Sequence, residues 1–403
     1  MKLESRLIFR TMSRVPQLWK FSSGYFFLFV LLLAATACRA PGGKVTGVTP
    51  LNEPAPVRLA DKPMPAPPAP TETAKPQLPA MASGPLAKPA PRPPTLPNGW
   101  VPLEVWAGTN GWSKPRLLDS TTTLSYALQS TNHSSRFTIG SREARVDDAD
   151  CWLGFPPKLI NGRPHIHALD LEKTLLPLWS RNGELPIRNR VIVLDPGHGG
   201  DDPGSRSVAA MRFEKEFTLD WARRLRPLLE TRGWHVFVTR TNDAAVSLAD
   251  RVKLAEDVRA DLFVSLHFNS ASPGVNSAGL ETYCLTPMGM PSNVTRNYAD
   301  DPNEFFPNNA FDEQNVQLAA RLHRSVLAET NRTDRGVHRA RFMGVLRGHN
   351  RPAVLIEGGY LSNPEEAELI GTPAYRQKLA HAVARALNGL LHPESSRLTR
   401  NER

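Results

Sequence analysis

Four side chains that suit metal-assisted hydrolysis are spread through the second half of the chain. His198 lies in a Gly-rich turn after an apolar run, and His267 ends a predicted strand. Glu214 opens a predicted helix, and Glu357 follows a second apolar run. Two imidazoles and one carboxylate match a catalytic zinc site, which keeps its fourth position for water. A further carboxylate beside that water can act as a general base.

The elements that must position these residues alternate between strand and helix from about residue 190 onward. Strands are predicted at 191–194, 234–239, 261–267, 280–285, 342–346 and 353–356, and helices at 214–231, 248–258, 313–330, 364–369 and 375–391. This alternation predicts an α/β fold with an open, mostly parallel sheet flanked by helices. In such sheets the ligand crevice lies at the carboxyl ends of the strands, where two His and two Glu can converge.

Each of these residues also has a plainer interpretation when it is taken alone. A histidine in a Gly-rich turn can be a turn former, and a glutamate at a helix start favours the helix dipole. Asp195 and Asn269 either orient groups near the metal or form turns. The metal site is predicted because all of the required residues occur together.

At these positions the chain resembles the zinc-dependent N-acetylmuramoyl-L-alanine amidases, type 3 family. The matching segments are Val193-Leu194-Asp195-Pro196-Gly197-His198-Gly199-Gly200, Glu214-Lys215 with Leu219 and Ala222, Ser265-Leu266-His267-Phe268-Asn269, Asp334-Arg335-Gly336-Val337 and Pro352-Ala353-Val354-Leu355-Ile356-Glu357-Gly358-Gly359-Tyr360-Leu361-Ser362-Asn363. The resemblance covers residues 190–392, about half the chain. Its ordered motifs are specific together, whereas any one of them alone is weak.

The resemblance implies zinc ligands at His198, Glu214 and His267 and a catalytic role for Glu357. Glu216 is a rival ligand, but the family pattern favours the glutamate before Lys215. The implied reaction is hydrolysis of the amide bond between N-acetylmuramic acid and L-alanine in peptidoglycan. Two alternatives remain: a zinc peptidase that trims peptide ends, and a non-catalytic wall-binding protein. The latter would be expected to have lost a ligand or the base, and neither is lost here.

Residues 99–182 are predicted to form a small α+β domain before the catalytic one. Strands are expected at 101–107, 124–128, 136–139 and 143–146, and then comes a turn-rich segment at 158–164. A final strand and a short helix end the domain. The strand pattern resembles the stalk-like domain named after the copper amine oxidase N-terminus. We expect it to act as a spacer or wall-docking domain.

The first 98 residues predict export and a tether. Residues 1–38 combine a basic start, a short apolar run and small residues before Cys38, as in a secretory signal. The run before Cys38 resembles a lipobox, so lipidation of Cys38 and ordinary cleavage near Ala37 are both open. Residues 39–98, rich in Pro and Ala, predict an extended disordered linker. The last segment, 393–403, is a short tail.

The chain has 403 residues and a formal net charge of +10. The positive charge is dispersed, so we expect no nucleic-acid binding. We expect the protein to be located in the periplasm or the cell envelope, where its positive charge favours association with anionic polymers and membrane surfaces. A membrane lipid anchor and a protein activator both remain open as partners. Cys151 and Cys284 are expected to be separate, partly buried thiols rather than a disulfide.

The connection 286–312 is long and polar for a compact domain. It carries Asp300, Asp301 and Glu304. One hypothesis is that a carboxylate from this segment occupies the open zinc position and holds the enzyme inactive. The alternative is a plain disordered insertion.

Overall fold

The computed structural model describes residues 99–391 apart from 120–122, 181–184, 186, 272–273 and 296–299. The predicted signal peptide, Cys38, the linker 39–98 and the tail 393–403 lie outside the described residues. Within the described part, no helix is both long enough and apolar enough to span a lipid bilayer.

The sheet of the region 190–392 carries the candidate site residues. Its spatial order is β10 (His235–Val238), β9 (Val191–Pro196), β11 (Leu262–Asn269), β14 (Ala353–Tyr360), β12 (Leu280–Cys284) and β13 (Asp334–Arg339). The first four strands run parallel, β12 runs antiparallel to β14, and β13 runs parallel to β12. The carboxyl ends of β9, β11 and β14 therefore lie at the same edge as the amino ends of β12 and β13. We call this edge the site edge.

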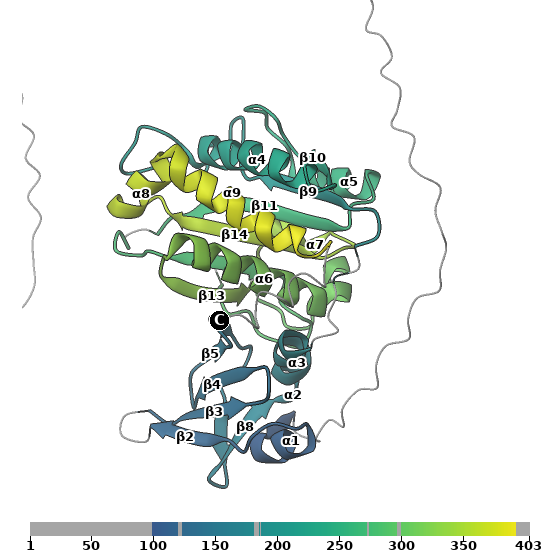
Figure 1. The fold of residues 1–403 in the computed structure, drawn as a ribbon, viewed down its shortest axis with the longest axis vertical. Helices are drawn as coiled ribbons and strands as arrows, with labels where there is room; N and C mark the ends of the chain where they lie inside the picture. The colour runs from purple at the N-terminus through teal and green to yellow at the C-terminus, as the bar shows by residue number, and fades with distance from the viewer. Residues whose placement is uncertain are drawn as a thin grey trace, which may run out of the picture. The chain divides into compact units, whose positions relative to one another are not determined.

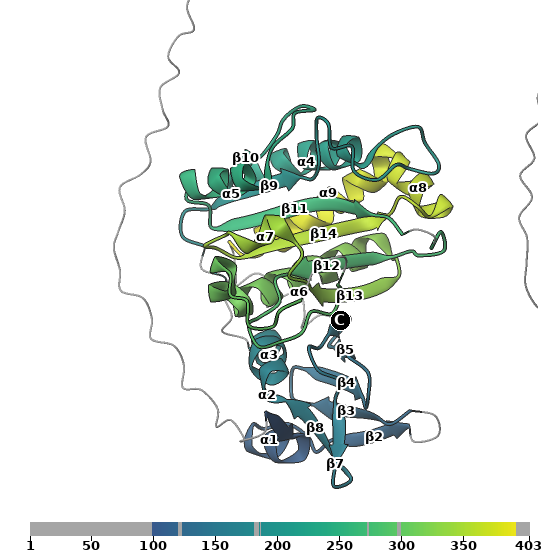
Figure 2. The same cartoon turned by 180° about the vertical axis from the view of Figure 1, so that it is seen from behind.

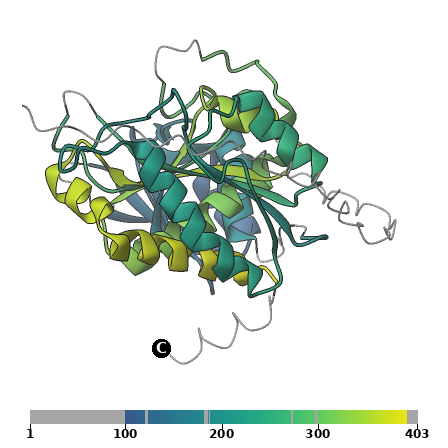
Figure 3. The ribbon, with the colours of Figure 1, turned by 90° about the horizontal axis from the view of Figure 1, so that it is seen from above.

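Helices cover both faces of this sheet (Figures 1 and 2). One face packs on α4 (Glu214–Glu230), α6 (Asp312–Thr330) and α9 (Pro373–Asn388), and the other on α5 (Leu248–Asp257) and α7 (Gly344–Arg347). Figure 3 shows α4 in teal and α9 in yellow lying side by side. Alternate residues of β9 enter the two cores, Ile192 and Leu194 on one face and Val191 and Val193 on the other. Strands covered on both faces are apolar throughout, which explains the unbroken run in β9.

Residues 99–179 form two smaller sets of strands with short helices. An antiparallel meander contains β2 (Arg116–Asp119), β3 (Ser125–Gln129), β4 (Ser134–Thr138), β5 (Glu143–Val146) and β6 (Ala149–Trp152). A separate three-stranded sheet contains β1 (Trp100–Pro102), β8 (Arg163–His167) and β7 (Lys158–Ile160), and the helical parts are α1 (Leu103–Thr109), α2 (Ala168–Asp170), the π-helical η1 (Leu171–Leu175) and α3 (Leu176–Trp179). The likeness of this region to a copper amine oxidase domain stays a prediction.

Two predicted strands are wrong. Residues 101–107 form mostly helix α1, because Leu103, Trp106 and Ala107 are buried at a spacing that only a helix places on one face. The run 342–346 gives the short helix α7, since an apolar run of this length does not distinguish a strand from a buried helical turn. Four observed strands, β2, β6, β7 and β13, were not predicted as such. Cys151 and Cys284 are free and buried, which confirms the expected separate thiols.

The segment 286–312 leaves the end of β12 that lies opposite the site edge. Its Asp300 carboxylate accepts hydrogen bonds from the Ser292 hydroxyl and from buried Arg341, both at 2.7 Å. The side-chain amide of Asn309, in the short helix η2 (Pro307–Phe311), donates to the Thr286 carbonyl. The hypothesis that a carboxylate of this segment occupies the zinc position is therefore wrong for Asp300, which is held at the edge of the sheet opposite the site edge.

The meander continues the main sheet, because Cys151 of β6 pairs with Val337 of β13. We call this junction between β6 and β13 the seam, and Asp334 stabilises it through both carboxylate oxygens. Its Oδ2 accepts from Arg145 Nη1 at 3.1 Å and from the Asp150 amide at 2.9 Å. Its Oδ1 lies 2.9 Å from Nε2 of His323 on α6. Burial alone would raise the pKa of Asp334, but these hydrogen bonds and charges outweigh it and hold that pKa below its usual value.

Asp334→Asn should lower the free energy of unfolding by about 1–3 kcal/mol at pH 7, because hydrogen bonds to a charged group are lost. A lowered folded-state pKa contributes stability that is present above the unfolded value, about pH 4, and is lost as the pH falls below it. The gap between wild type and variant should therefore shrink at pH 3, as measured by urea unfolding at both pH values.

The matched control is Asp148→Asn, which removes an exposed ion pair with Arg324 and should cost less than about 1 kcal/mol. A gap between wild type and Asp334→Asn that widened at pH 3 would contradict the seam as described.

Candidate metal centre

His198 stands in a tight turn directly after β9. Its backbone φ is +63°, in the left-handed region that few non-glycine residues adopt. Gly197, just before it, allows close packing, because a Cβ there would lie 2.2 Å from the His267 ring. Gly204 has the same role, since its Cβ would lie 2.6 Å from the His198 ring and 2.7 Å from a Glu214 oxygen. The Gly-rich sequence therefore lets three site residues approach one another.

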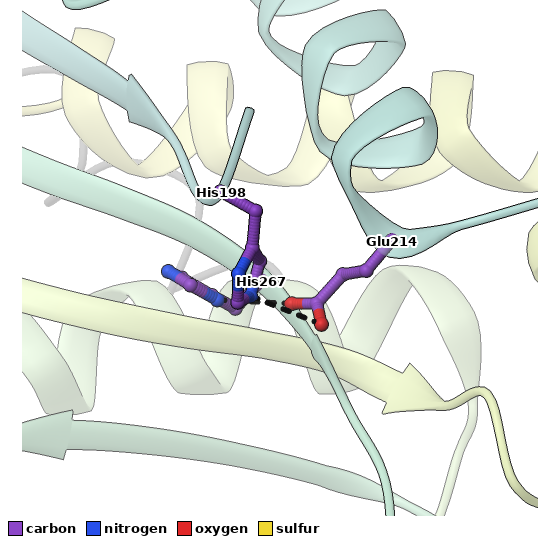
Figure 4. A group of neighbouring side chains, drawn as sticks. All are labelled: His198, Glu214 and His267. Carbon is purple, nitrogen blue, oxygen red and sulfur yellow. Dashed lines mark hydrogen bonds and ion pairs between the residues drawn. The ribbon is translucent and has the colours of Figure 1, made fainter. Parts of the chain in front are cut away.

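Glu214 is the first residue of α4, and its carboxylate faces both histidine side chains (Figure 4). Its Oε1 is 2.9 Å from His267 Nδ1, and its Oε2 is 3.1 Å from His198 Nε2. The backbone amides of Phe268 and Ser205 each donate to one of these oxygens at 3.0 Å. Burial would raise the pKa of Glu214, but the histidines outweigh it and hold that pKa far below its usual value.

His198, Glu214 and His267 offer ligand atoms that all lie within 4.8 Å of one another. They are the one such group of three or more His, Cys, Asp or Glu residues among the described residues. Two imidazole nitrogens and an ionised carboxylate at this spacing fit a first-row metal ion with an open coordination position. The three predicted ligands thus come together as expected.

Asp202 orients His198, and the sequence interpretation missed it. The Asp202 Oδ2 lies 2.8 Å from His198 Nδ1, and Oδ1 accepts the Gly204 amide. Burial would raise the pKa of Asp202, but the hydrogen bonds with His198 and the Gly204 amide and the charge of His198 together outweigh it and lower that pKa. A carboxylate on Nδ1 leaves Nε2 facing the cluster, as in carboxylate–histidine–metal arrangements. The only sequence signal is an Asp four residues after the His.

Asp195 lies away from the three ligand residues and supports the turn instead. It is buried and accepts hydrogen bonds from Thr239, Ser265 and Arg251. The Nη2 of Arg251 donates to the His198 carbonyl at 2.9 Å. A second buried guanidinium, that of Arg240, donates to the Gly197 carbonyl at 2.7 Å. Buried ion pairs and carbonyl contacts therefore fix the backbone that presents His198.

Glu357 lies beside His267, because the two are paired in register on β14 and β11. Paired residues of neighbouring strands point to the same face. The Glu357 side chain is 6% exposed. Asn269, two residues beyond His267, donates its amide to Glu281 Oε2 at 2.8 Å, so its contact is to this further carboxylate.

Glu216, the rival ligand, is turned to the outside of α4. Its carboxylate accepts from Arg212 Nε at 2.8 Å and from the Phe213 amide at 3.1 Å. It therefore closes the start of the helix and does not belong to the ligand cluster.

Known proteins resemble the part of the chain that carries this cluster. Residues 192–389 match the family model described as N-acetylmuramoyl-L-alanine amidase. The chain is 31% identical over 224 residues to the N-acetylmuramoyl-L-alanine amidase AmiA of Escherichia coli K12, covering 50% of this chain and 76% of that protein. This chain belongs to the N-acetylmuramoyl-L-alanine amidase family.

Further amidase relatives match the same half of the chain. It is 34% identical to AmiC of Neisseria meningitidis over 56% of this chain, and 34% identical to the probable cell wall amidase LytH of Staphylococcus epidermidis over 50%. The match spans 58% of the length of each of these two relatives. Among solved structures, the catalytic domain of the amidase CwlV from Bacillus (Paenibacillus) polymyxa is 30% identical, with a TM-score of 0.42 over 50% of this chain and 97% of that one.

His198→Ala and His267→Ala should each abolish metal binding by this chain, because each removes one of three protein ligands. Metal analysis of purified protein should find one zinc per wild-type chain and none in either variant. His381→Ala, on the exposed side of α9, should keep the metal. Stoichiometric zinc in the His198→Ala, His267→Ala double variant would refute the assignment.

Asp202→Asn should weaken metal affinity by about 10- to 100-fold, because the group that orients His198 loses its charge. Competition with a chelator measures this affinity. Asp201→Asn, at the exposed neighbouring position, is the matched control and should leave affinity unchanged. Equal affinity in both variants would mean that Asp202 has no part in holding the imidazole.

Proposed function

We propose that this chain hydrolyses the amide bond between N-acetylmuramic acid and L-alanine in peptidoglycan, with zinc held by His198, Glu214 and His267. The observation that carries the proposal is the cluster of these three residues beside a second, buried acid, Glu357. The donor set suits zinc because it combines two imidazoles with one carboxylate. Membership of the amidase family supports the substrate.

The residues of the chain have separate roles in the proposed reaction. When bound, zinc supplies polarisation of the amide carbonyl and a lowered pKa for a bound water. Glu357, one strand from His267, accepts the proton of the attacking water and passes it to the leaving amine. Asp202 and Glu214 keep both imidazoles oriented toward the centre. Asp195, through Arg251, holds the backbone of His198.

The cell-wall amidase family acts in the cell envelope. For this chain we propose export by the segment 1–38, with Cys38 as a lipid attachment site and residues 39–98 as a spacer. Residues 99–182 and 190–392 are proposed as the wall-docking and catalytic parts.

The experiment that tests the reaction is mass spectrometry of products released from purified sacculi. An amidase releases stem peptides with a free L-alanine amino end and leaves glycan strands without peptide. A zinc peptidase would instead release single amino acids or shortened peptides. Intact sacculi after prolonged incubation with zinc-loaded enzyme would refute the proposal.

Glu357→Gln should keep the fold and the zinc but lower turnover by about 10²–10⁴-fold, because the amide cannot accept the proton. Turnover is measured by peptide release and zinc by metal analysis of the same preparation. Glu216→Gln, which alters a glutamate outside the cluster, is the control and should retain activity. Loss of zinc in Glu357→Gln would make Glu357 a ligand, and full activity would exclude it as the base.

A further inference from the structure

The site edge continues past Glu357 onto two strands that run the other way. Glu281 of β12 is paired in antiparallel register with Glu357. Paired residues share a face, so the carboxylates of Glu281 and Glu357 extend from the same side of the sheet. Beyond β12 lies β13, whose second residue is Arg335. An acid and a base therefore follow the proposed catalytic residue along the edge.

Glu281 is buried, and both of its oxygens are fully engaged. Its Oε2 accepts from Asn269 Nδ2 at 2.8 Å and from the Tyr283 hydroxyl at 2.6 Å. Its Oε1 accepts from the Tyr360 hydroxyl at 2.8 Å and from Arg335 Nε at 2.5 Å. A carboxylate with four donors is held as an anion and has little capacity left for substrate. Its effect is to fix the groups that donate to it.

Arg335 is the one of these donors that extends into solvent. Its side chain is 39% exposed, and its guanidinium carbon lies 5.2 Å from the centre of the Tyr360 ring. Its Nε donates the hydrogen bond to Glu281, so this contact does not use the two Nη groups. Its backbone carbonyl accepts from Trp152 Nε1 at 3.0 Å. The guanidinium is thus held in one orientation with its open edge available to a ligand.

We propose that Arg335 binds a carboxylate of the stem peptide, one or two residues beyond the amide that is cut. A planar guanidinium matches a carboxylate with two parallel hydrogen bonds, and pre-orientation by Glu281 and Tyr360 reduces the entropy lost on binding. β13 lies two strands from β14, a distance of about 10 Å. The Arg335 guanidinium, however, lies against the ring of Tyr360, which belongs to β14 itself. An extended peptide covers about 3.4 Å per residue, or about 7 Å over two residues, so a carboxylate close to the cut bond comes within reach of this guanidinium. This inference rests on the proposed function.

The test compares three muramyl dipeptides that differ in one group. N-acetylmuramoyl-L-alanyl-D-glutamate has both carboxylates, the D-isoglutamine form lacks the α-carboxylate, and the D-glutamine form lacks the γ-carboxylate. Zinc-loaded full-length wild type should lose about 10- to 100-fold in kcat/KM, mainly through KM, when the recognised carboxylate is amidated. Arg335→Gln should show a similar loss on the glutamate substrate and no preference among the three. Arg335→Lys, which keeps the charge, should recover part of the preference.

Arg332→Gln is the matched control, because Arg332 lies just before β13 and pairs with Glu365. It should keep the wild-type preference. An Arg335→Gln variant that lowered kcat/KM equally on all three substrates would reduce Arg335 to a structural partner of Glu281 and overturn the proposal. A wild type without preference would overturn it as well.

Binding measured without turnover separates this inference from the proposed reaction. Calorimetry with L-alanyl-D-glutamate and its two amidated forms should show the same order of affinities in wild type and the loss of that order in Arg335→Gln. If wild type cleaves none of the muramyl dipeptides and also leaves sacculi intact, the proposed function fails, while the calorimetric comparison still decides whether Arg335 recognises a carboxylate. Equal affinities of wild type and Arg335→Gln for the glutamate dipeptide would refute recognition.

Discussion

The arrangement depends on one buried carboxylate, that of Glu214, shared between two imidazoles. Its two oxygens face His198 and His267 and accept two backbone amides. Leaving such a charge buried and unpaired would cost several kcal/mol, so the histidines and amides must stay in place for the fold to hold it. The same contacts bring together the donors that a metal ion requires. Stability and metal binding therefore demand the same geometry at this point.

The surrounding structure supplies that geometry through buried charge rather than through apolar packing alone. Arg251 and Arg240 donate hydrogen bonds to the carbonyl groups of the turn after β9, and the Asp195 carboxylate accepts a hydrogen bond from Arg251. A turn with positive φ at His198 exposes carbonyls that no strand or helix satisfies, and buried carbonyls need donors. Arginine provides several donors in a rigid fork, which suits adjacent carbonyls. The Asp195 carboxylate compensates the charge that this requires.

The sequence was sufficient for the parallel half of the site and insufficient for the rest. His198, His267 and Glu357 could be predicted because polar residues after apolar runs mark carboxyl ends of strands, which meet at one edge. Glu281 and Arg335 could not be found by this rule, since they stand at the starts of strands that run in the opposite direction. Asp202 lies in a loop whose path depends on the folded turn. Periodicity also failed for residues 101–107, because helix α1 is too short for the helical spacing of its apolar residues to be recognised.

The reversal of β12 and β13 also links the upstream region to the site. Residues 149–152 lie along β13. In this seam they contact Asp334 and Gly336, the two residues that flank Arg335 in the sequence. Asp334 is held by Arg145 and the Asp150 amide, and a Cβ on Gly336 would lie 2.9 Å from the Trp152 ring. The Trp152 indole itself bonds the Arg335 carbonyl. Because strand backbone is stiff and these contacts are fixed on both sides, any shift of β6 against β13 must also move the backbone that carries Arg335.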